Sequence, residues 1–264
     1  MISIAHISDL HFGREVGQIR DGLLEELQAF APTLVAVSGD LTQRASLPEF
    51  QAAADFLKQL QQPALVVPGN HDIPGWRVHA RLLAPWRGWR LHFGDPHAVQ
   101  AIRRPGLCAI GVNTARTWGW HWDWSRGRIH ARQLADIEAE LRHADEGALR
   151  VVVAHHPFLA TESAAGRGIV GRSEMALRRL NGLADLMLGG HVHLGYSGLA
   201  GSLVVAQSGT SISGRLKGEP NGYNRIHADA SSLRVEVMRW HGDGFAAHAT
   251  RSYRRAGSGW VAAD

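Results

Sequence analysis

The chain has 264 residues, of which 45% are hydrophobic and 20% are charged. This balance is enough to bury a core, and it excludes an intrinsically disordered or a fibrous protein. The formal net charge of +4 is spread along the chain, which disfavours nucleic acid as a partner and leaves weak attraction to phosphorylated ligands open.

Short apolar runs rich in β-branched residues alternate with amphipathic stretches along most of the chain. The runs predict buried strands at 2–7, 33–37, 64–67, 108–112, 150–154, 186–188 and 203–206. The amphipathic stretches predict helices at 19–30, 48–61 and 131–144. This alternation predicts an α/β fold with a largely parallel sheet.

The pattern changes after about residue 200 to strand and turn signals, with clear alternation over 233–240. The final segment, 255–264, is composed of small and polar residues and predicts a loosely held tail. No internal repeat or linker divides the chain. We therefore expect a single domain over residues 1–264.

Polar side chains follow five of the predicted strands, at the point where each strand ends. In chain order they are Asp9 and His11; Asp40; Asn70, His71 and Asp72; His155 and His156; and His191 and His193. Ligands of open α/β sheets bind outside the carboxyl ends of the strands. The sequence therefore predicts one pocket that collects these side chains.

Glycines and a two-residue spacing accompany these polar residues. Gly39, Gly69 and Gly190 each precede a candidate ligand, where the strand has to turn and the backbone has to approach the site. The segments 9–11 and 191–193 read DLH and HVH. Their spacing predicts that both polar side chains of each segment lie on one face of an extended backbone.

The candidate metal ligands are more numerous than one ion requires. They are Asp9, His11, Asp40, Asn70, His155, His191 and His193. Seven donors exceed one tetrahedral site, but a bridging Asp40 divides them into two sets of four, which predicts two divalent ions about 3.5–4 Å apart. Mixed oxygen and nitrogen donors suit Mn, Fe, Zn, Co or Ni, and the donor set does not choose among these metals.

A histidine near a strand end is more often a packed or surface residue than a ligand. We interpret the histidines outside the five clusters in that way. Taken alone, DLH or HVH is equally weak evidence. All five clusters in this order, each after a predicted strand, are difficult to obtain from packing alone, so the context favours a site.

The motifs DLH, GD, GNHD, HHP and GHVH resemble those of the calcineurin-like metallophosphoesterase superfamily, from residue 9 to residue 193. The forms HISDLHFG, SGDLT, VPGNHD and GGHVHLGY are most similar to the bacterial cyclic-nucleotide phosphodiesterase group. The resemblance implies an α/β fold in which a β-sandwich of two mixed sheets is flanked by helices. It also implies a dinuclear metal site at one end of the sheets.

The resemblance further implies a role for each matching residue. One metal would be held by Asp9, His11, Asp40 and His193, and the other by Asp40, Asn70, His155 and His191. Asn70 would also stabilise the substrate phosphate, and His71 would act as the acid for the leaving group. Asp72 is predicted to orient His71 through the other ring nitrogen. His156 would have a supporting or substrate-facing role.

The function that follows is a metal-dependent phosphodiesterase acting on a small phosphate ester, with a 3′,5′-cyclic nucleotide as one candidate. A metal-bridging hydroxide would attack the phosphorus while His71 assists the leaving group. The alternatives are a phosphomonoesterase or a pyrophosphohydrolase on the same centre. A nuclease is disfavoured because no long basic stripe is present, and a non-catalytic metal-binding scaffold is expected to lack His71 or several ligands.

The segment 116–124 reads RTWGWHWDW, with four alternating tryptophans. One interpretation is an aromatic wall that stacks on a flat substrate group, with Trp118 and Trp120 as substrate residues. The other is packing over the core or against a second copy of the chain. A homo-oligomer is therefore left open.

The cellular location is predicted from two features. Cys108 is the single cysteine, so no disulfide can form within the chain. The N-terminus lacks the pattern of a signal peptide, and no uncharged run approaches the ~20 residues of a membrane span. We expect a cytoplasmic protein without a membrane partner.

Overall fold

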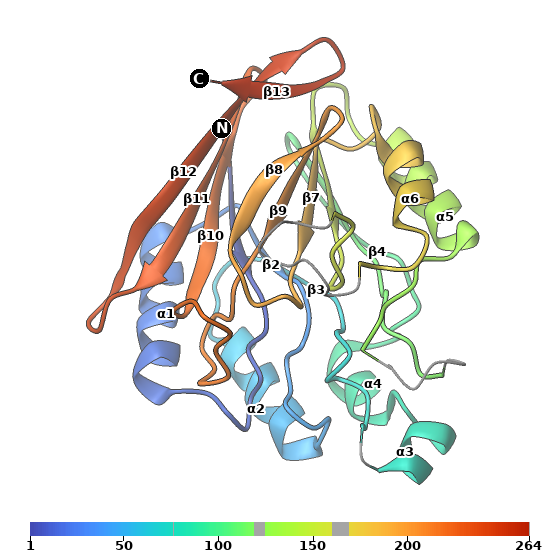
Figure 1. The fold of residues 1–264 in the computed structure, drawn as a ribbon, viewed down its shortest axis with the longest axis vertical. Helices are drawn as coiled ribbons and strands as arrows, with labels where there is room; N and C mark the ends of the chain where they lie inside the picture. Colours follow the sequence, from blue (N-terminus) through green and yellow to red (C-terminus); the bar gives the residue numbers. More distant parts are fainter. Residues whose placement is uncertain (76, 119–124, 160–168, 264) are drawn as a thin grey trace.

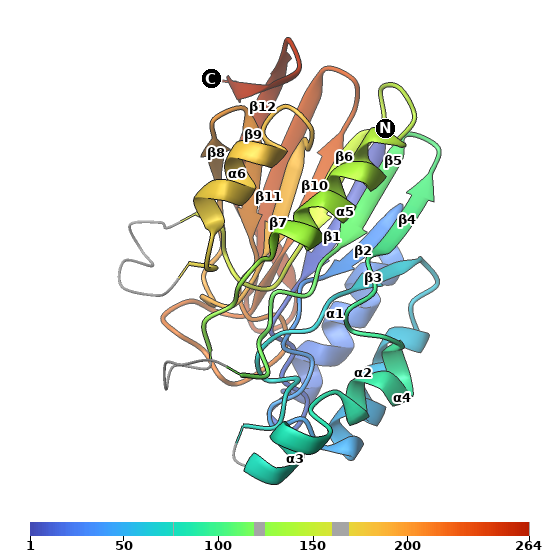
Figure 2. The ribbon, with the colours of Figure 1, turned by 90° about the vertical axis from the view of Figure 1, so that its right-hand side faces the viewer.

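Two mixed β-sheets pack face to face, and helices cover their outer faces (Figures 1 and 2). The computed structural model describes residues 1–75, 77–118, 125–159 and 169–263. The larger sheet has the order β13-β12-β11-β10-β1-β2-β3, and the smaller one β4-β5-β6-β7-β9-β8. The architecture is the α/β sandwich of two mixed sheets that the sequence resemblance implies.

The strands run as follows. In the larger sheet they are β1 (Ile2–Ile7), β2 (Leu34–Val37), β3 (Ala64–Val66), β10 (Gly222–Ala228), β11 (Ser232–Trp240), β12 (Phe245–Ala256) and β13 (Gly259–Ala263). In the smaller sheet they are β4 (Gln100–Arg104), β5 (Leu107–Gly111), β6 (Leu149–Val153), β7 (Leu186–Gly189), β8 (Tyr196–Ala200) and β9 (Leu203–Gln207).

The smaller sheet has a parallel centre and antiparallel edges, whereas the larger sheet is parallel at one end and antiparallel over the rest. The strands β1, β2 and β3 are parallel in the larger sheet, as are β5, β6, β7 and β9 in the smaller one. The remaining pairs are antiparallel. The β–α alternation predicted the parallel parts correctly, but it could not predict that they belong to two sheets.

Burial on both faces explains why the central strands are apolar throughout. In β2, Leu34 and Ala36 face the layer between the sheets, whereas Val35 and Val37 face the layer beneath α1 (Gly17–Phe30) and α2 (Leu47–Lys58). Successive side chains of a strand point to opposite faces, so a strand covered on both sides has no polar position.

The helices lie in two outer layers. Their bounds beyond α1 and α2 are α3 (Val78–Leu83), α4 (Arg87–Phe93), α5 (Ala131–Arg142) and α6 (Ser173–Leu180). Just before α2, the Ser46 amide donates to the Glu49 carboxylate at 3.2 Å, as in a capping box. None of the helices in the described ranges combines the length and the apolar character needed to cross a lipid bilayer.

The prediction of a loose tail over 255–264 is wrong for the residues that the structure describes there. Arg255 belongs to β12, and residues 259–263 form β13 at the edge of the larger sheet. Trp260 is fully buried, and its indole nitrogen donates to Asp185 at 3.1 Å. Small and polar composition did not reveal that one buried tryptophan attaches this strand to the core.

Candidate metal centre

The five polar clusters lie together at the carboxyl ends of β1, β2, β3, β6 and β7. The parallel strands of the two sheets end on the same side of the molecule, so loops that are far apart in sequence converge there. Five of the seven candidate ligands are buried, and Asn70 and His191 are half-buried. The predicted pocket is therefore present.

One group of donors surrounds Asp9. Its Oδ1 atom lies 3.6 Å from His11 Nε2 and 3.4 Å from His193 Nε2. His11 Nε2 lies 3.8 Å from Asp40 Oδ2. Ligand atoms about 2.1 Å from one tetrahedral ion lie about 3.4 Å from each other. The spacing of these atoms therefore fits a cation between them.

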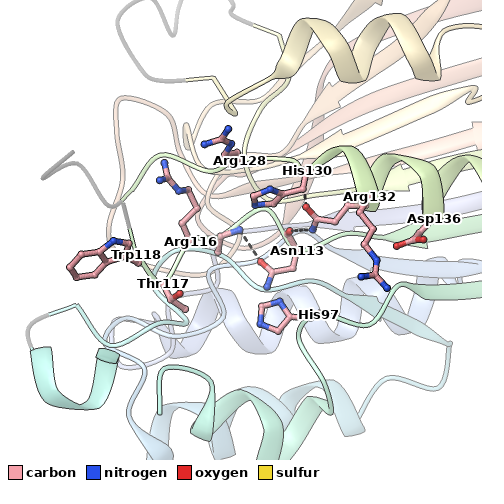
Figure 3. Close-up of a pocket in the computed structure, with 11 residues that line it drawn as sticks. His97, Asn113, Arg116, Thr117, Trp118, Arg128, His130, Arg132 and Asp136 are labelled. Carbon is pink, nitrogen blue, oxygen red and sulfur yellow. Dashed lines mark hydrogen bonds between the residues drawn. The ribbon is translucent and has the colours of Figure 1, made fainter. Parts of the chain in front are cut away.

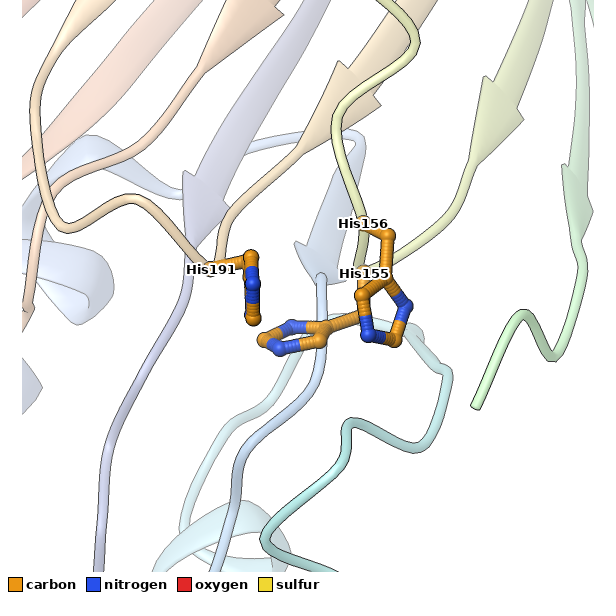
Figure 4. Close-up of side chains that lie close together, drawn as sticks. All are labelled: His155, His156 and His191. Carbon is orange, nitrogen blue, oxygen red and sulfur yellow. The ribbon is translucent and has the colours of Figure 1, made fainter. Parts of the chain in front are cut away.

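A second group of donors surrounds the Asn70 side chain. Asn70 Oδ1 lies 3.2 Å from His155 Nε2 and 3.0 Å from His191 Nδ1. His155 Nε2 is also 3.4 Å from Asp40 Oδ1. Figure 4 shows the rings of His155 and His191 side by side at this position, and they are nearly perpendicular, with an interplanar angle of 82°. These four residues have the spacing of a second cation site.

Asp40 lies between the two groups, with Oδ2 toward His11 and Oδ1 toward His155. Oδ1 also accepts a hydrogen bond from the His71 amide at 2.8 Å, which fixes the carboxylate plane. One carboxylate with its two oxygens directed at two donor groups is the arrangement that a bridging ligand requires.

Backbone and hydroxyl oxygens orient three of the imidazoles. The Nδ1 atoms of His11 and His155 lie 3.3 Å and 2.7 Å from the carbonyl oxygens of Thr42 and Ser38. Carbonyl oxygens only accept, so Nδ1 carries the proton and Nε2 presents its lone pair to the cluster. His193 Nδ1 is held in the same way by Thr210 Oγ1 at 2.5 Å.

The backbone of the segments 9–11 and 191–193 is not extended, contrary to the sequence prediction. The φ angles are 52° at Asp9, 47° at His11, 72° at His191 and 63° at His193, and Asp40 has 52°. Left-handed conformations are uncommon for residues other than glycine and collect at functional sites. His191 and His193 point to different donor groups, as the family resemblance implies, and do not share one face.

The prediction that glycines allow close approach is confirmed at Gly69 and Gly190. A Cβ atom at Gly69 would lie 2.1 Å from Asp40 Oδ1, and one at Gly190 would lie 1.9 Å from Ser8 Oγ. Both distances are shorter than any contact between nonbonded atoms. A larger residue at either position would therefore displace the carboxylates of Asp40 or Asp9.

The electrostatic environment prepares the imidazoles for cations. Burial is the main factor that lowers the pKa of His191 to about 3 and that of His193 to about 4, so both rings are neutral near pH 7. Burial also disfavours charge on His155, but the adjacent Asp40 raises its pKa to about 9. A cation bound at His155 must displace that proton.

Asp72 does not orient His71, contrary to the sequence prediction. Its carboxylate is fully buried and accepts hydrogen bonds from the amides of Gly69 (2.9 Å), Leu41 (3.2 Å) and Thr42 (2.9 Å). Asp72 therefore joins the loop after β2 to the loop after β3. It positions the backbone that carries Asp40 and Asn70, and it acts on the site through that backbone.

His71 contacts two groups that sequence reasoning did not find. Its Nδ1 atom lies 2.9 Å from the carbonyl oxygen of Gln43, and its Nε2 atom lies 2.6 Å from Arg215 Nη1. The first contact requires a proton on Nδ1, so Nε2 accepts from the guanidinium. Burial and the charge of Arg215 both contribute to a lowered pKa of His71. In the sequence, Arg215 lies in a glycine-rich segment with no pattern that indicates its role.

His156 was predicted to have a supporting or a substrate-facing role, and the structure excludes the second of these. The ring is fully buried, with Nε2 donating to the Ser125 carbonyl at 2.8 Å and Nδ1 2.8 Å from Thr114 Oγ1. Both nitrogens are engaged, so His156 supports the loop beside His155 (Figure 4). Trp118 is 66% exposed, and Trp120 lies outside the described residues, so the aromatic wall stays a prediction.

The model of the calcineurin-like phosphoesterase family matches residues 2–195, which contain all seven candidate ligands. The chain belongs to this family. Members with similar sequences include a glycerophosphodiester phosphodiesterase of Enterobacter lignolyticus, which is 27% identical over 59% of this chain and 57% of that protein. A protein of Synechococcus named as a probable cyclic nucleotide phosphodiesterase is 27% identical over 38% of this chain and 46% of its own length.

The family fold also agrees with solved structures. A dimetal phosphatase from Danio rerio superposes with a TM-score of 0.63 over 89% of this chain and 95% of that chain, at 13% identity. At this identity the likeness establishes the fold alone. The matched regions cover from 37% to 57% of the curated family members' own lengths, so their activities are not transferred with the family.

Proposed function

We propose that this chain is a metal-dependent phosphodiesterase that hydrolyses small phosphodiesters, with 3′,5′-cyclic nucleotides among the candidate substrates. The observation that carries the proposal is the pair of donor groups on either side of Asp40, with His71 and Arg215 beside them. A cavity of about 240 Å³ lined by Asn70 and His71 adjoins these groups and suits a small ligand.

The donor set itself supports two cations. Asp9 Oδ1 and His11 Nε2 are buried without a hydrogen-bond partner, an arrangement that is costly unless a ligand satisfies them. Asp9, His11, His193 and Asp40 would hold one cation, and Asp40, Asn70, His155 and His191 the other. Two divalent cations supply an activated water near neutral pH and neutralise charge that develops on the phosphate.

His71 and Arg215 lie where they could act on the two charged parts of the ester, the phosphate and the departing oxygen. In the structure the Arg215 guanidinium donates to His71 Nε2. A phosphate entering beside Asn70 offers Arg215 a charged acceptor, which binds a guanidinium more strongly than a neutral imidazole does. Arg215 would then contact the phosphate and release Nε2, which could take up a proton from solvent. The imidazolium, held by the Gln43 carbonyl through Nδ1, would then give that proton to the departing ester oxygen.

The departing group of an alkyl phosphodiester or phosphomonoester is an alkoxide, a poor leaving group that gains from a proton donor such as His71. A diester is favoured over a monoester because of the relatives of this chain. The names of the two bacterial relatives, a glycerophosphodiester phosphodiesterase and a probable cyclic nucleotide phosphodiesterase, point to diesters.

The proposal is tested by removing metals with a chelator and restoring Mn, Fe, Co or Zn singly. Rates are then measured on bis-p-nitrophenyl phosphate, p-nitrophenyl phosphate and 3′,5′-cyclic AMP. We expect activity to disappear and return with the metal, with kcat/KM higher for the diesters. Higher kcat/KM on the monoester, or hydrolysis that is insensitive to the chelator, would contradict the proposal.

A further inference from the structure

A second cavity lies between the loop after β5 and the first turn of α5, and its residues take no part in the candidate metal centre (Figure 3). Its volume is about 720 Å³, three times that of the cavity beside His71. We call it the arginine cleft, because Arg116, Arg128 and Arg132 line it. A cavity of this size accommodates a small organic molecule.

The charge of the arginine cleft is strongly positive. Among the described residues that line it, three guanidiniums are opposed by one carboxylate, that of Asp136, which leaves two positive charges. Within the described part of the chain, no ion pair joins Arg116, Arg128 or Arg132 to a carboxylate. Burial and the charges of Arg128 and Arg116 also lower the pKa of His130, which lines the same cleft.

Asn113 supplies an independent indication that the cleft takes a ligand. Only 7% of this residue is exposed, and its Nδ2 atom is buried without a hydrogen-bond partner. The Ala115 amide donates to Asn113 Oδ1 at 2.8 Å, so the remaining atom of the side chain must be the NH₂ donor. Figure 3 shows this side chain directed across the cleft toward His97. A buried N–H donor without a partner calls for an acceptor atom, which a ligand in the cleft can supply.

The ligand chemistry follows from charge and size. Two net positive charges balance a phosphate monoester, which carries about two negative charges near neutral pH. Guanidiniums bind phosphate through paired N–H groups. The cleft is much larger than a phosphate, and the exposed ring of Trp118 at its edge offers a surface for a flat group.

The segment 113–117 separates the arginine cleft from the metal centre. Thr114 hydrogen-bonds His156 next to His155, and the carbonyl oxygens of Arg116 and Thr117 accept from Arg81, which lines the cavity beside His71. The cleft is therefore close to the metal centre but built from different side chains.

We propose that the arginine cleft is a binding site for an organic phosphate monoester, with the ligand held by the guanidiniums that line the cleft and by the Asn113 amide. The site does not depend on the metals. It therefore stands or falls separately from the proposed phosphodiesterase activity.

The test is calorimetric titration of the full chain with AMP, before and after treatment with a chelator. AMP carries a phosphate monoester and a flat base, and adenosine serves as the probe that lacks the phosphate. We expect AMP to bind with and without the chelator, inorganic phosphate to compete with it, and adenosine to bind at least about 10-fold more weakly.

Arg128→Gln and Arg132→Gln should each weaken AMP binding by about 10-fold. Arg142→Gln is the matched control, because Arg142 lies at the other end of α5 and is 61% exposed. Asn113→Asp, which replaces the donor by a second carboxylate, should also weaken binding. AMP binding that vanishes with the chelator, or that is equal in wild type, Arg128→Gln and Arg132→Gln, would overturn the proposal.

Discussion

A buried carboxylate lies at each end of β7, and the two differ in whether both of their oxygens have hydrogen-bond partners. Before the strand, Asp185 accepts from the Arg150 amide at 2.9 Å, from Trp260 and from Arg255. After the strand, the His191 amide donates to Asp9 Oδ2 at 3.0 Å, but Asp9 Oδ1 has no hydrogen-bond partner.

This difference in hydrogen bonding indicates that Asp185 stabilises the fold, whereas Asp9 is available to bind a ligand. Asp185 is satisfied by donors of the protein itself, so it needs nothing else to be buried. Asp9 and Asp40 keep oxygens directed at imidazole lone pairs, and the backbone at both residues is left-handed. These features lower the stability of the fold, and proteins retain them at sites where a bound ligand compensates for the loss. Mutations at the two ends should therefore affect different measurements.

The largest effect is expected from Asp40→Ala. Because the carboxylate faces both donor groups, its loss should remove metal from both positions and lower kcat/KM by about 10³-fold or more. Elemental analysis gives the metal-to-protein ratio, and Asp243→Ala, at an exposed position, is the control. An unchanged metal ratio would show that Asp40 does not bridge.

His71→Ala should leave the metal content unchanged and reduce kcat by about 10²–10⁴-fold. The loss should be larger for 3′,5′-cyclic AMP than for bis-p-nitrophenyl phosphate, because nitrophenolate leaves without a proton. The exposed His79 provides a matched control, His79→Ala. Equal losses on the two substrates would argue against His71 as the proton donor.

Arg215→Gln should raise KM for phosphate esters by about 10-fold, since a charge-assisted hydrogen bond to the phosphate is lost. Metal content and stability should stay at wild-type values. Arg14→Gln is the control, because Arg14 is exposed and its carbonyl oxygen, which the substitution keeps, accepts from Gly214 of the same loop. A KM equal to that of wild type would remove Arg215 from the substrate site.

Asp185→Ala tests the opposite end of β7 and should change stability alone. Three donors lose a charged acceptor, so the free energy of unfolding should fall by about 1.5–3 kcal/mol. Urea denaturation measures this change, and elemental analysis of the same variant should give the wild-type metal ratio. Metal loss in Asp185→Ala would mean that the two ends are not independent.

Much of the site could be predicted from the sequence because its residues follow strands. The apolar runs defined where β1, β2, β3, β6 and β7 end, and parallel strands bring their ends together. The residues that hold these side chains in place were not predictable in the same way. Thr210, Ser38 and Gln43 act through single oxygens, and a hydroxyl or carbonyl leaves no pattern in sequence.

The sequence by itself determined the family, the apolar strands and the identity of the donors, because periodicity and residue chemistry are local properties. Only the tertiary structure decided that the backbone at Asp9, His11, His191 and His193 is left-handed and that Asp72 holds backbone amides instead of His71. It also decided that Trp260 anchors the last strand and that Arg215 contacts His71. Each of these depends on a left-handed backbone turn or on a contact between distant segments, and neither is encoded in the spacing of residues along the chain.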